Sequence, residues 1–180
     1  MKKVVVFIAD GTEEVEVLTP VDMLRRAGAQ VIFAGVPKAE CVCAHGVKIT
    51  ADASAADCIG EDLDMVVLPG GMPGTLNLEK DESVKAIVKK AYDDGKFVSA
   101  ICAAPSVLGK MGMLRGKKAT CFPGFEQYLD GAVYTGERVV RDENIVTSCG
   151  AGAAMDFALT LVACLYGEEK AEELRKAVFA

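Results

Sequence analysis

Short, uninterrupted apolar runs alternate along this chain with segments whose apolar residues recur at helical spacing. Three runs predict strands buried on both faces, and each ends at a polar or glycine-rich turn: Lys3–Ala9, Met65–Leu68 and Phe97–Ile101. Residues 30–35 predict a further strand, and residues 83–94 predict a helix with one apolar stripe. Because strands and helices alternate, we expect the strands to pair in parallel.

The remaining patterns are shorter. Residues 41–50 alternate around His45-Gly46 and predict a small β-hairpin laid against the main sheet. Strands are also expected near residue 119 and at 139–141 and 145–148, and helices at 105–111, 153–165 and 168–178. No repeat or linker interrupts the chain, so residues 1–180 predict one α/β domain, a doubly wound, mostly parallel sheet with helices on both faces. Ligand sites of such sheets lie beyond the carboxyl ends of the strands.

The composition narrows the class of protein. The 180 residues are 51% hydrophobic but only 6% aromatic, which is typical of strands buried on both faces. A formal charge of −6, with basic residues dispersed among acidic ones, argues against a nucleic-acid partner. No apolar stretch approaches the ~20 residues that span a bilayer, so we expect a soluble cytoplasmic protein without membrane contact. Seven cysteines, an odd number with no Cys-x-x-Cys pair, argue against a disulfide framework.

Cys102 is the cysteine whose local pattern favours reactivity. The buried strand before it leads directly into a helix expected to begin near Pro105, which is the pattern of a nucleophile elbow. The small neighbours Ala103 and Ala104 suit such a sharp turn. The N-terminus of the helix and its free N–H groups are expected to lower the pKa of the thiol. The same pattern also fits a cysteine that only packs in the core.

Two glycines follow another predicted strand and let backbone N–H groups approach a ligand closely. These are Gly70 and Gly71. If the N–H groups of Gly71 and Ala103 face one point, they would stabilise an oxyanion that develops on a carbonyl substrate. An ordinary glycine turn explains the same two residues equally well.

Glu16 is the acidic residue with an unusual setting. It is flanked by apolar residues, and Pro20 cannot donate the helical hydrogen bond to its carbonyl, so we expect the backbone there to be kinked or not yet helical. In an apolar setting beside a thiolate, the Glu16 carboxyl would stay protonated and could donate a hydrogen bond to sulfur. It could then exchange protons with a substrate.

Other polar residues have simpler explanations. Glu13 and Glu14 are expected to face solvent at a helix N-terminus, where negative charge is favourable. Cys41, Cys43 and His45 occupy alternate positions and would share one face of a strand, as metal ligands can. Because no fourth ligand follows at a standard spacing, packing or a place on the rim of a pocket is the better explanation, and no metal is expected.

Three segments together resemble a known family: Glu16 after the first strand, Gly70-Gly71 after a middle one, and residues 100–105 at the elbow. With Pro20-Val21-Asp22 and residues 147–152, they closely resemble the DJ-one/ThiJ/PfpI superfamily, nearest the branch of the parkinsonism-associated protein deglycase and its bacterial relatives. The resemblance covers nearly the whole chain. It implies a flavodoxin-like fold, a homodimer, no cofactor, and a nucleophilic, oxidisable Cys102 with Glu16 as its protonated partner.

The chain also departs from that family. Phe122-Pro123 stands where some relatives carry a histidine before the proline, so a general acid is missing there. Ala103 stands where the protease branch carries a histidine, which disfavours a cysteine peptidase. His45 is a candidate proton shuttle in place of the lost histidine. The resemblance implies a pocket lined by Gly70, His45, Cys43, Phe122 and Pro123.

Two functional hypotheses follow from the resemblance. In the first, Cys102 attacks the aldehyde of a 2-oxoaldehyde such as methylglyoxal or glyoxal, and Glu16 moves protons until water releases a hydroxy acid. The same addition step would repair early glycation adducts on proteins. In the second, the protein is a redox sensor or a chaperone-like protective protein whose Cys102 is oxidised to a sulfinic acid. We favour the enzyme, and repeated turnover separates the two hypotheses.

Overall fold

The computed structural model describes residues 1–180. Its strands are β1 (Lys3–Ala9), β2 (Gln30–Val36), β3 (Glu40–Val42), β4 (Lys48–Thr50), β5 (Ala53–Ser54), β6 (Met65–Leu68), β7 (Phe97–Ile101), β8 (Lys118–Ala119), β9 (Val133–Tyr134), β10 (Val139–Asp142) and β11 (Ile145–Ser148). Its helices are α1 (Glu14–Arg26), α2 (Gly74–Lys80), α3 (Glu82–Asp93), α4 (Pro105–Lys110), α5 (Ala154–Tyr166) and α6 (Glu168–Ala177). Short 3-10 turns are η1 (Ala55–Cys58), η2 (Glu126–Tyr128) and η3 (Ala151–Ala153).

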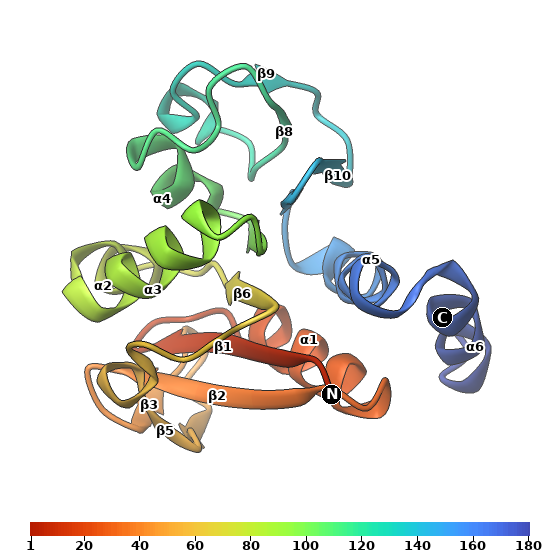
Figure 1. The fold of residues 1–180 in the computed structure, drawn as a ribbon. Coiled ribbons are helices and arrows are strands. Elements are labelled where there is room, and N and C mark those ends of the chain that lie inside the picture. Colours follow the sequence, from red (N-terminus) through yellow and green to blue (C-terminus); the bar gives the residue numbers. More distant parts are fainter.

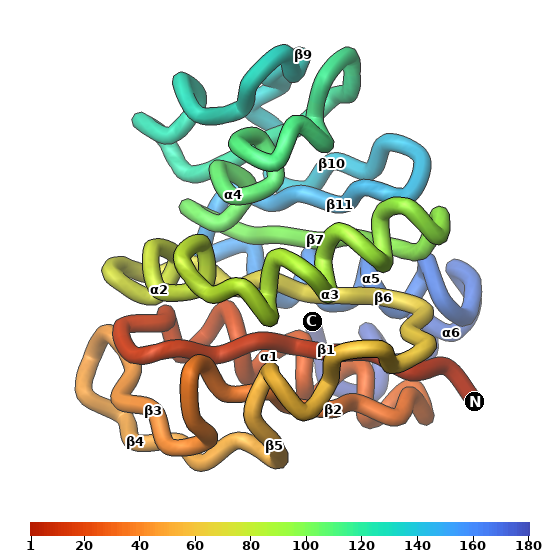
Figure 2. Tube along the Cα trace, turned by 60° about the vertical axis from the view of Figure 1, so that its left-hand side comes forward, coloured from red at the N-terminus to blue at the C-terminus, as the bar shows by residue number.

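Seven strands form one sheet in the order β10-β11-β7-β6-β1-β2-β5. All neighbours in it are parallel except β10, which pairs antiparallel with β11. Helices cover both faces: α1, α5 and α6 pack on one, and α2, α3 and α4 on the other (Figure 1). Figure 2 shows α2 and α3 on the near side of the sheet and α5 and α6 behind it. The expected α/β class, with a flavodoxin-like order of layers, is confirmed.

The central strand β1 shows why the apolar runs are continuous. Successive side chains of a strand point to opposite faces, and both faces here are covered by helices. Val4, Val6 and Ile8 therefore join the core under α1, α5 and α6, while Val5, Phe7 and Ala9 join the core under α2, α3 and α4. Each core cluster contains 26 buried residues. The sheet is thus packed between two layers of helices.

The predicted elements are confirmed within a residue or two, and several short ones were missed. The hairpin forms as expected, with β3 antiparallel to β4 and Gly46 in the bend at φ 86°. The missed elements are α2, β5, β9 and the 3-10 turns, which are too short for a hydrophobic period to develop. None of the helices is both long and apolar enough to span a bilayer.

The prediction that the backbone at Glu16 is not yet helical was wrong. Helix α1 runs without a break from Glu14 to Arg26 and contains both Glu16 and Pro20. Pro20 is the seventh residue of α1, beyond the first turn, so it lacks the N–H group that would donate to the Glu16 carbonyl, yet the helix continues past it. Glu16 is thus held in the first turn of α1.

The fold brings the three predicted segments to one edge of the sheet. The carboxyl ends of β1, β6 and β7 lie side by side because these strands are parallel neighbours. The loop after β1 leads into α1, the loop after β6 carries Gly70-Gly71, and the turn after β7 carries Cys102. The hairpin closes this edge on the β2 side, where Val42 O accepts a hydrogen bond from Gly11 N–H at 2.8 Å.

Candidate active site

Cys102 occupies a strained turn between β7 and α4. Its φ is 64°, a left-handed conformation that is rare for residues with a side chain and that raises the thiol above the sheet edge. The backbone is held on both sides, because Cys102 N–H donates to Ser148 O and Phe122 N–H donates to Cys102 O, each at 2.8 Å. The expected sharp strand-to-helix turn is present, and the helix after it begins at Pro105 as predicted.

The glycine loop after β6 packs directly against this turn. A Cβ atom on Gly70 would lie 2.5 Å from Glu16 Oε2 and 2.6 Å from Cys102 Cβ, so only glycine fits between the two side chains. Gly71 has a φ of 88° and is in close contact with the backbone of Glu13. The N–H groups of Gly71 and Ala103 are directed at the Cys102 sulfur and lower the pKa of its thiol. The structure therefore brings these two N–H groups together at the sulfur.

Glu16 is buried beside the thiol, with 1% of its surface exposed. Its Oε2 accepts a hydrogen bond from Gly70 N–H at 3.0 Å, whereas Oε1 is buried without a partner. Burial raises the pKa of the Glu16 carboxyl to about 7, and the negative charge of Glu13 adds to the effect. Both protonation states of Glu16 are therefore populated near neutral pH, where a group that exchanges protons is most useful.

The expected lowering of the Cys102 pKa was wrong. Burial raises the pKa of the thiol to about 12, and the charge of Glu16 and its hydrogen bond act in the same direction. The N–H groups of Gly71 and Ala103 oppose this but do not outweigh it. Helix α4 has only 6 residues, so its dipole is small. The thiol is thus neutral at neutral pH, with the Glu16 carboxyl as its hydrogen-bond partner.

Contrary to the sequence prediction, Cys41, Cys43 and His45 do not share one face of a strand. His45 lies in the hairpin bend with an exposed ring, whereas Cys41 and Cys43 are buried, so the three side chains do not share a face. The turn rotates His45 away from the two cysteines. Its Nδ1 lies 3.1 Å from Glu14 Oε2 and 3.4 Å from Glu13 Oε2. The structure gives His45 carboxylate partners and places it in no cysteine cluster.

Glu14 was expected to face solvent but is buried. Its Oε1 accepts a hydrogen bond from His45 N–H at 2.8 Å. Burial acts to raise the pKa of the Glu14 carboxyl, but hydrogen bonds from its own and neighbouring backbone N–H groups and from the His45 ring outweigh it and lower the pKa. The same contact raises the pKa of the His45 imidazole. Glu14 thus fastens the hairpin to the start of α1, a role that sequence spacing could not reveal because the partners are 31 residues apart.

The other residues expected to line the pocket differ in their exposure to solvent. The Phe122 ring is half exposed and lies against Gly150, with Phe122 Cδ2 within 3.3 Å of where a Gly150 Cβ would be. Pro123 is exposed beside it. Cys43 is buried in the core on the α1 face, and burial raises the pKa of its thiol to about 11. Its place in a substrate pocket stays a prediction.

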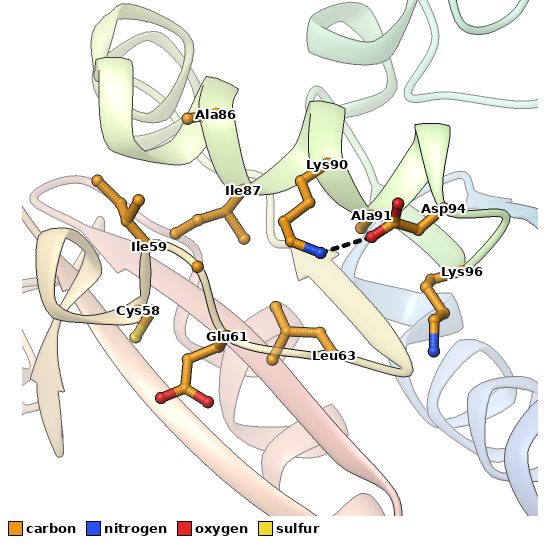
Figure 3. A pocket seen from close by; sticks show the side chains of 11 residues that line it. Cys58, Ile59, Glu61, Leu63, Ala86, Ile87, Lys90, Ala91, Asp94 and Lys96 are labelled. Carbon is orange, nitrogen blue, oxygen red and sulfur yellow. Dashed lines mark hydrogen bonds and ion pairs between the residues drawn. The ribbon is translucent and has the colours of Figure 1, made fainter.

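One cavity lies away from these residues. It holds about 180 Å³ between η1 and α3, near the amino ends of β6 and β7. Figure 3 shows Ile87 and Leu63 facing its interior, with the Lys90–Asp94 ion pair on the α3 side. Burial raises the pKa of the Cys58 thiol in its lining. Because the elbow is at the carboxyl ends of the strands, this cavity is separate from the candidate active site.

The comparisons with known proteins agree with this geometry. A sequence profile described as the DJ-1/PfpI family matches residues 2–164. The chain belongs to the DJ-1/PfpI family. Its family relatives include "Protein DJ-1 homolog B" of Arabidopsis thaliana, 43% identical over 96% of this chain and 40% of that protein. The chain therefore spans less than half the length of that relative.

Two further members of the family are similar over nearly their whole length. "Glutathione-independent glyoxalase DJR-1.2" of Caenorhabditis elegans is 33% identical over 93% of this chain and 90% of that protein. The solved structure titled "Toxoplasma gondii DJ-1, oxidized" superposes with a TM-score of 0.96 at 35% identity, covering 99% of this chain and 98% of the other. Membership in the family is thus supported by sequence and by fold.

Proposed function

We propose that the protein converts reactive 2-oxoaldehydes, such as methylglyoxal and glyoxal, to 2-hydroxy acids without a cofactor. The observation that carries this proposal is the arrangement at the elbow: a strained cysteine, two backbone N–H groups directed at its sulfur, and a buried carboxyl with a pKa of about 7. The name of the Caenorhabditis elegans relative supports the same reaction class. Protein adducts of these aldehydes are alternative substrates of the same addition step.

The reaction begins with proton transfer from the Cys102 thiol to the Glu16 carboxylate. The sulfur then adds to the aldehyde carbon and gives a hemithioacetal, whose oxygen is stabilised by the N–H groups of Gly71 and Ala103. Transfer of the hydrogen from the former aldehyde carbon to the neighbouring carbonyl carbon, with Glu16 as the proton carrier, gives a hydroxyacyl thioester. Water hydrolyses the thioester and frees Cys102, so methylglyoxal and one water yield lactate.

The competing proposal is a redox sensor or chaperone-like protective protein that uses the same thiol. It is supported by the oxidised state named for the Toxoplasma gondii relative and by the partly exposed Cys102. A cysteine peptidase is disfavoured, because Ala103 follows the nucleophile and the single histidine, His45, binds Glu13 and Glu14.

A homodimer is part of the proposal. Exposed apolar side chains lie on the outer face of α1 and on the hairpin that packs beside its start: Val15, Leu18, Val42 and Val47. A second copy would remove this surface from water. All seven cysteines are free, which supports a reducing, cytoplasmic setting.

Lactate formation from methylglyoxal, without glutathione or an added cofactor, tests the enzyme proposal. We expect many turnovers per protein, none with Cys102→Ser, and a loss of about 100-fold with Glu16→Gln, since general acid–base catalysis contributes this much. Cys58→Ser, at the far end of the sheet, is the matched control and should retain activity. Absence of turnover in the wild-type protein would refute the enzyme and favour the redox protein.

A further inference from the structure

A second cysteine lies beside the elbow and has no part in the proposed carbonyl chemistry. Strand β11 is the parallel neighbour of β7, and their last paired residues are Ser148 and Ile101. The ladder continues by one hydrogen bond, from Cys102 N–H to Ser148 O at 2.8 Å. Cys149 follows Ser148 directly. Figure 2 shows β7 and β11 side by side. Cys102 and Cys149 are therefore the first residues after two adjacent parallel strands, at the same edge of the sheet.

This backbone spacing suits a disulfide. Neighbouring strands of a sheet are about 4.8 Å apart, and the Cα atoms of a disulfide are typically about 4.4 to 6.8 Å apart. Both cysteines lie just outside regular structure, Cys102 in its left-handed turn and Cys149 in the segment before η3. Cys149 N–H donates to Arg138 O at 3.1 Å, which keeps the backbone at Cys149 beside Ser148 at this edge of the sheet.

The other thiols are less suited to react with Cys102. Cys121 is the nearest alternative, because the next residue, Phe122, donates its N–H to Cys102 O. However, Cys121 is fully buried in the core on the α4 face, whereas Cys102 packs against the opposite core. Burial also raises the pKa of the Cys121 thiol to about 12, which disfavours the thiolate. Cys149 is partly exposed and belongs to neither core cluster.

We propose that Cys149 is the resolving cysteine of Cys102, so that oxidation by a hydroperoxide ends in an intramolecular Cys102–Cys149 disulfide. In the first step the Cys102 thiol is oxidised to a sulfenic acid, and the hydroperoxide is reduced to an alcohol or water. In the second step the Cys149 sulfur attacks the sulfenic sulfur, the S–O bond breaks, and the Cys149 proton leaves with the oxygen as water. A small thiol or a dithiol protein then reduces the disulfide by exchange.

The disulfide would protect the site from irreversible damage. A sulfenic acid without a partner thiol is oxidised further to a sulfinic acid, which ordinary thiols do not reduce. With Cys149 in place, peroxide would switch carbonyl processing off and a thiol reductant would restore it. This inference rests on the proposed reactivity of Cys102, but it does not require that Cys102 turn over 2-oxoaldehydes.

Limited peroxide oxidation followed by mass spectrometry tests the proposal. The full-length reduced protein is treated with a small excess of hydrogen peroxide, its free thiols are alkylated, and its peptides are mapped without reduction. We expect a crosslinked pair of peptides containing Cys102 and Cys149, and recovery of all seven thiols after reduction. In Cys149→Ser and Cys149→Ala, the sulfinic acid at Cys102 should form about tenfold faster than in the wild type.

Two further observations complete the test. Cys121→Ser is the matched control and should form the same disulfide as the wild type. The proposal is overturned if wild type and both Cys149 variants accumulate sulfinic acid equally, or if Cys102 bonds to Cys121 or to a second chain. Reduced Cys149→Ser should turn over methylglyoxal at the wild-type rate. If neither protein turns it over but the wild type forms the disulfide, the proposed function fails and this inference stands.

Discussion

The buried carboxyl of Glu16 should make the protein less stable as the pH rises, and Glu16→Gln should remove this dependence. Burial raises the pKa of this group from 4.5 to about 7 in the folded protein. The folded state therefore binds the proton more tightly than the unfolded chain does between these two values. The contribution of Glu16 to stability is greatest below pH 4.5 and falls as the pH rises towards 7. Well above pH 7 the Glu16 carboxyl is ionised in the folded and the unfolded protein, so its contribution to stability no longer changes with pH.

The size of the effect follows from the two pKa values. One pKa unit is equivalent to about 1.4 kcal/mol, so ionisation of Glu16 should cost about 3 kcal/mol in the free energy of unfolding. Glutamine has nearly the same shape, and its oxygen can accept the Gly70 N–H, but it cannot ionise. For a chain of this size, the melting temperature of Glu16→Gln relative to wild type should rise by about 6 to 12 °C between acidic and mildly alkaline pH.

Urea unfolding of wild type and Glu16→Gln, followed by circular dichroism near pH 4.5 and near pH 8, measures the difference in their free energies of unfolding at each pH. Thermal unfolding at the same pH values measures the difference in melting temperature. A buried amide without a partner has a cost of its own, but that cost does not vary with pH, so the change between the two pH values isolates the carboxyl. Glu137→Gln, an exposed site without an ion pair, controls for the loss of one negative charge. Equal pH dependence in wild type and Glu16→Gln would refute the argument that burial governs this group.

Three further predictions follow from single contacts. Gly70→Ala should lower methylglyoxal turnover by about 100-fold, because the new Cβ displaces Glu16 and Cys102 from each other. Gly152→Ala is the control, because a Cβ at this position meets no other atom. Equal activity of the two variants would contradict the packing argument. His45→Gln should change methylglyoxal turnover by less than about threefold, because the His45 ring is exposed and binds carboxylates. A larger loss of turnover, with an altered pH–rate profile, would identify His45 as the proton shuttle. Asp81→Ala should lower the free energy of unfolding by about 1 kcal/mol, as measured by urea titration. The reason is that the Asp81 side chain caps α3 by accepting a hydrogen bond from Val84 N–H at 3.0 Å. No change in the free energy of unfolding would mean that water replaces the cap.

The sequence was a good guide where one local pattern decides the structure. The strand Lys3–Ala9 is apolar throughout because both of its faces are covered, and its bounds could be read directly from the chain. The strand-to-helix turn at Cys102 was also predicted, since a buried run, small residues and a proline succeed one another within a few positions. The family membership that these motifs predicted is confirmed by sequence and fold.

Sequence reasoning was less successful where the answer depends on contacts between distant segments. Glu14 was expected in solvent, but the hairpin that carries His45 covers it. Similarly, the lowering of the Cys102 pKa was inferred from the helix alone, whereas burial and Glu16 decide its direction. Desolvation depends on everything that surrounds a group, and a local motif does not report it.

The sequence by itself determined the order of strands and helices, the α/β class, and the residue types available for chemistry, because periodicity and turn residues act over a few neighbouring positions. Only the tertiary structure decided how those residues meet. Parallel pairing set the register that places Cys149 beside Cys102, and close packing of Gly70 set the contact between Glu16 and the thiol. Protonation followed from the same packing, because the free energy of a charge depends on how much water the rest of the fold removes.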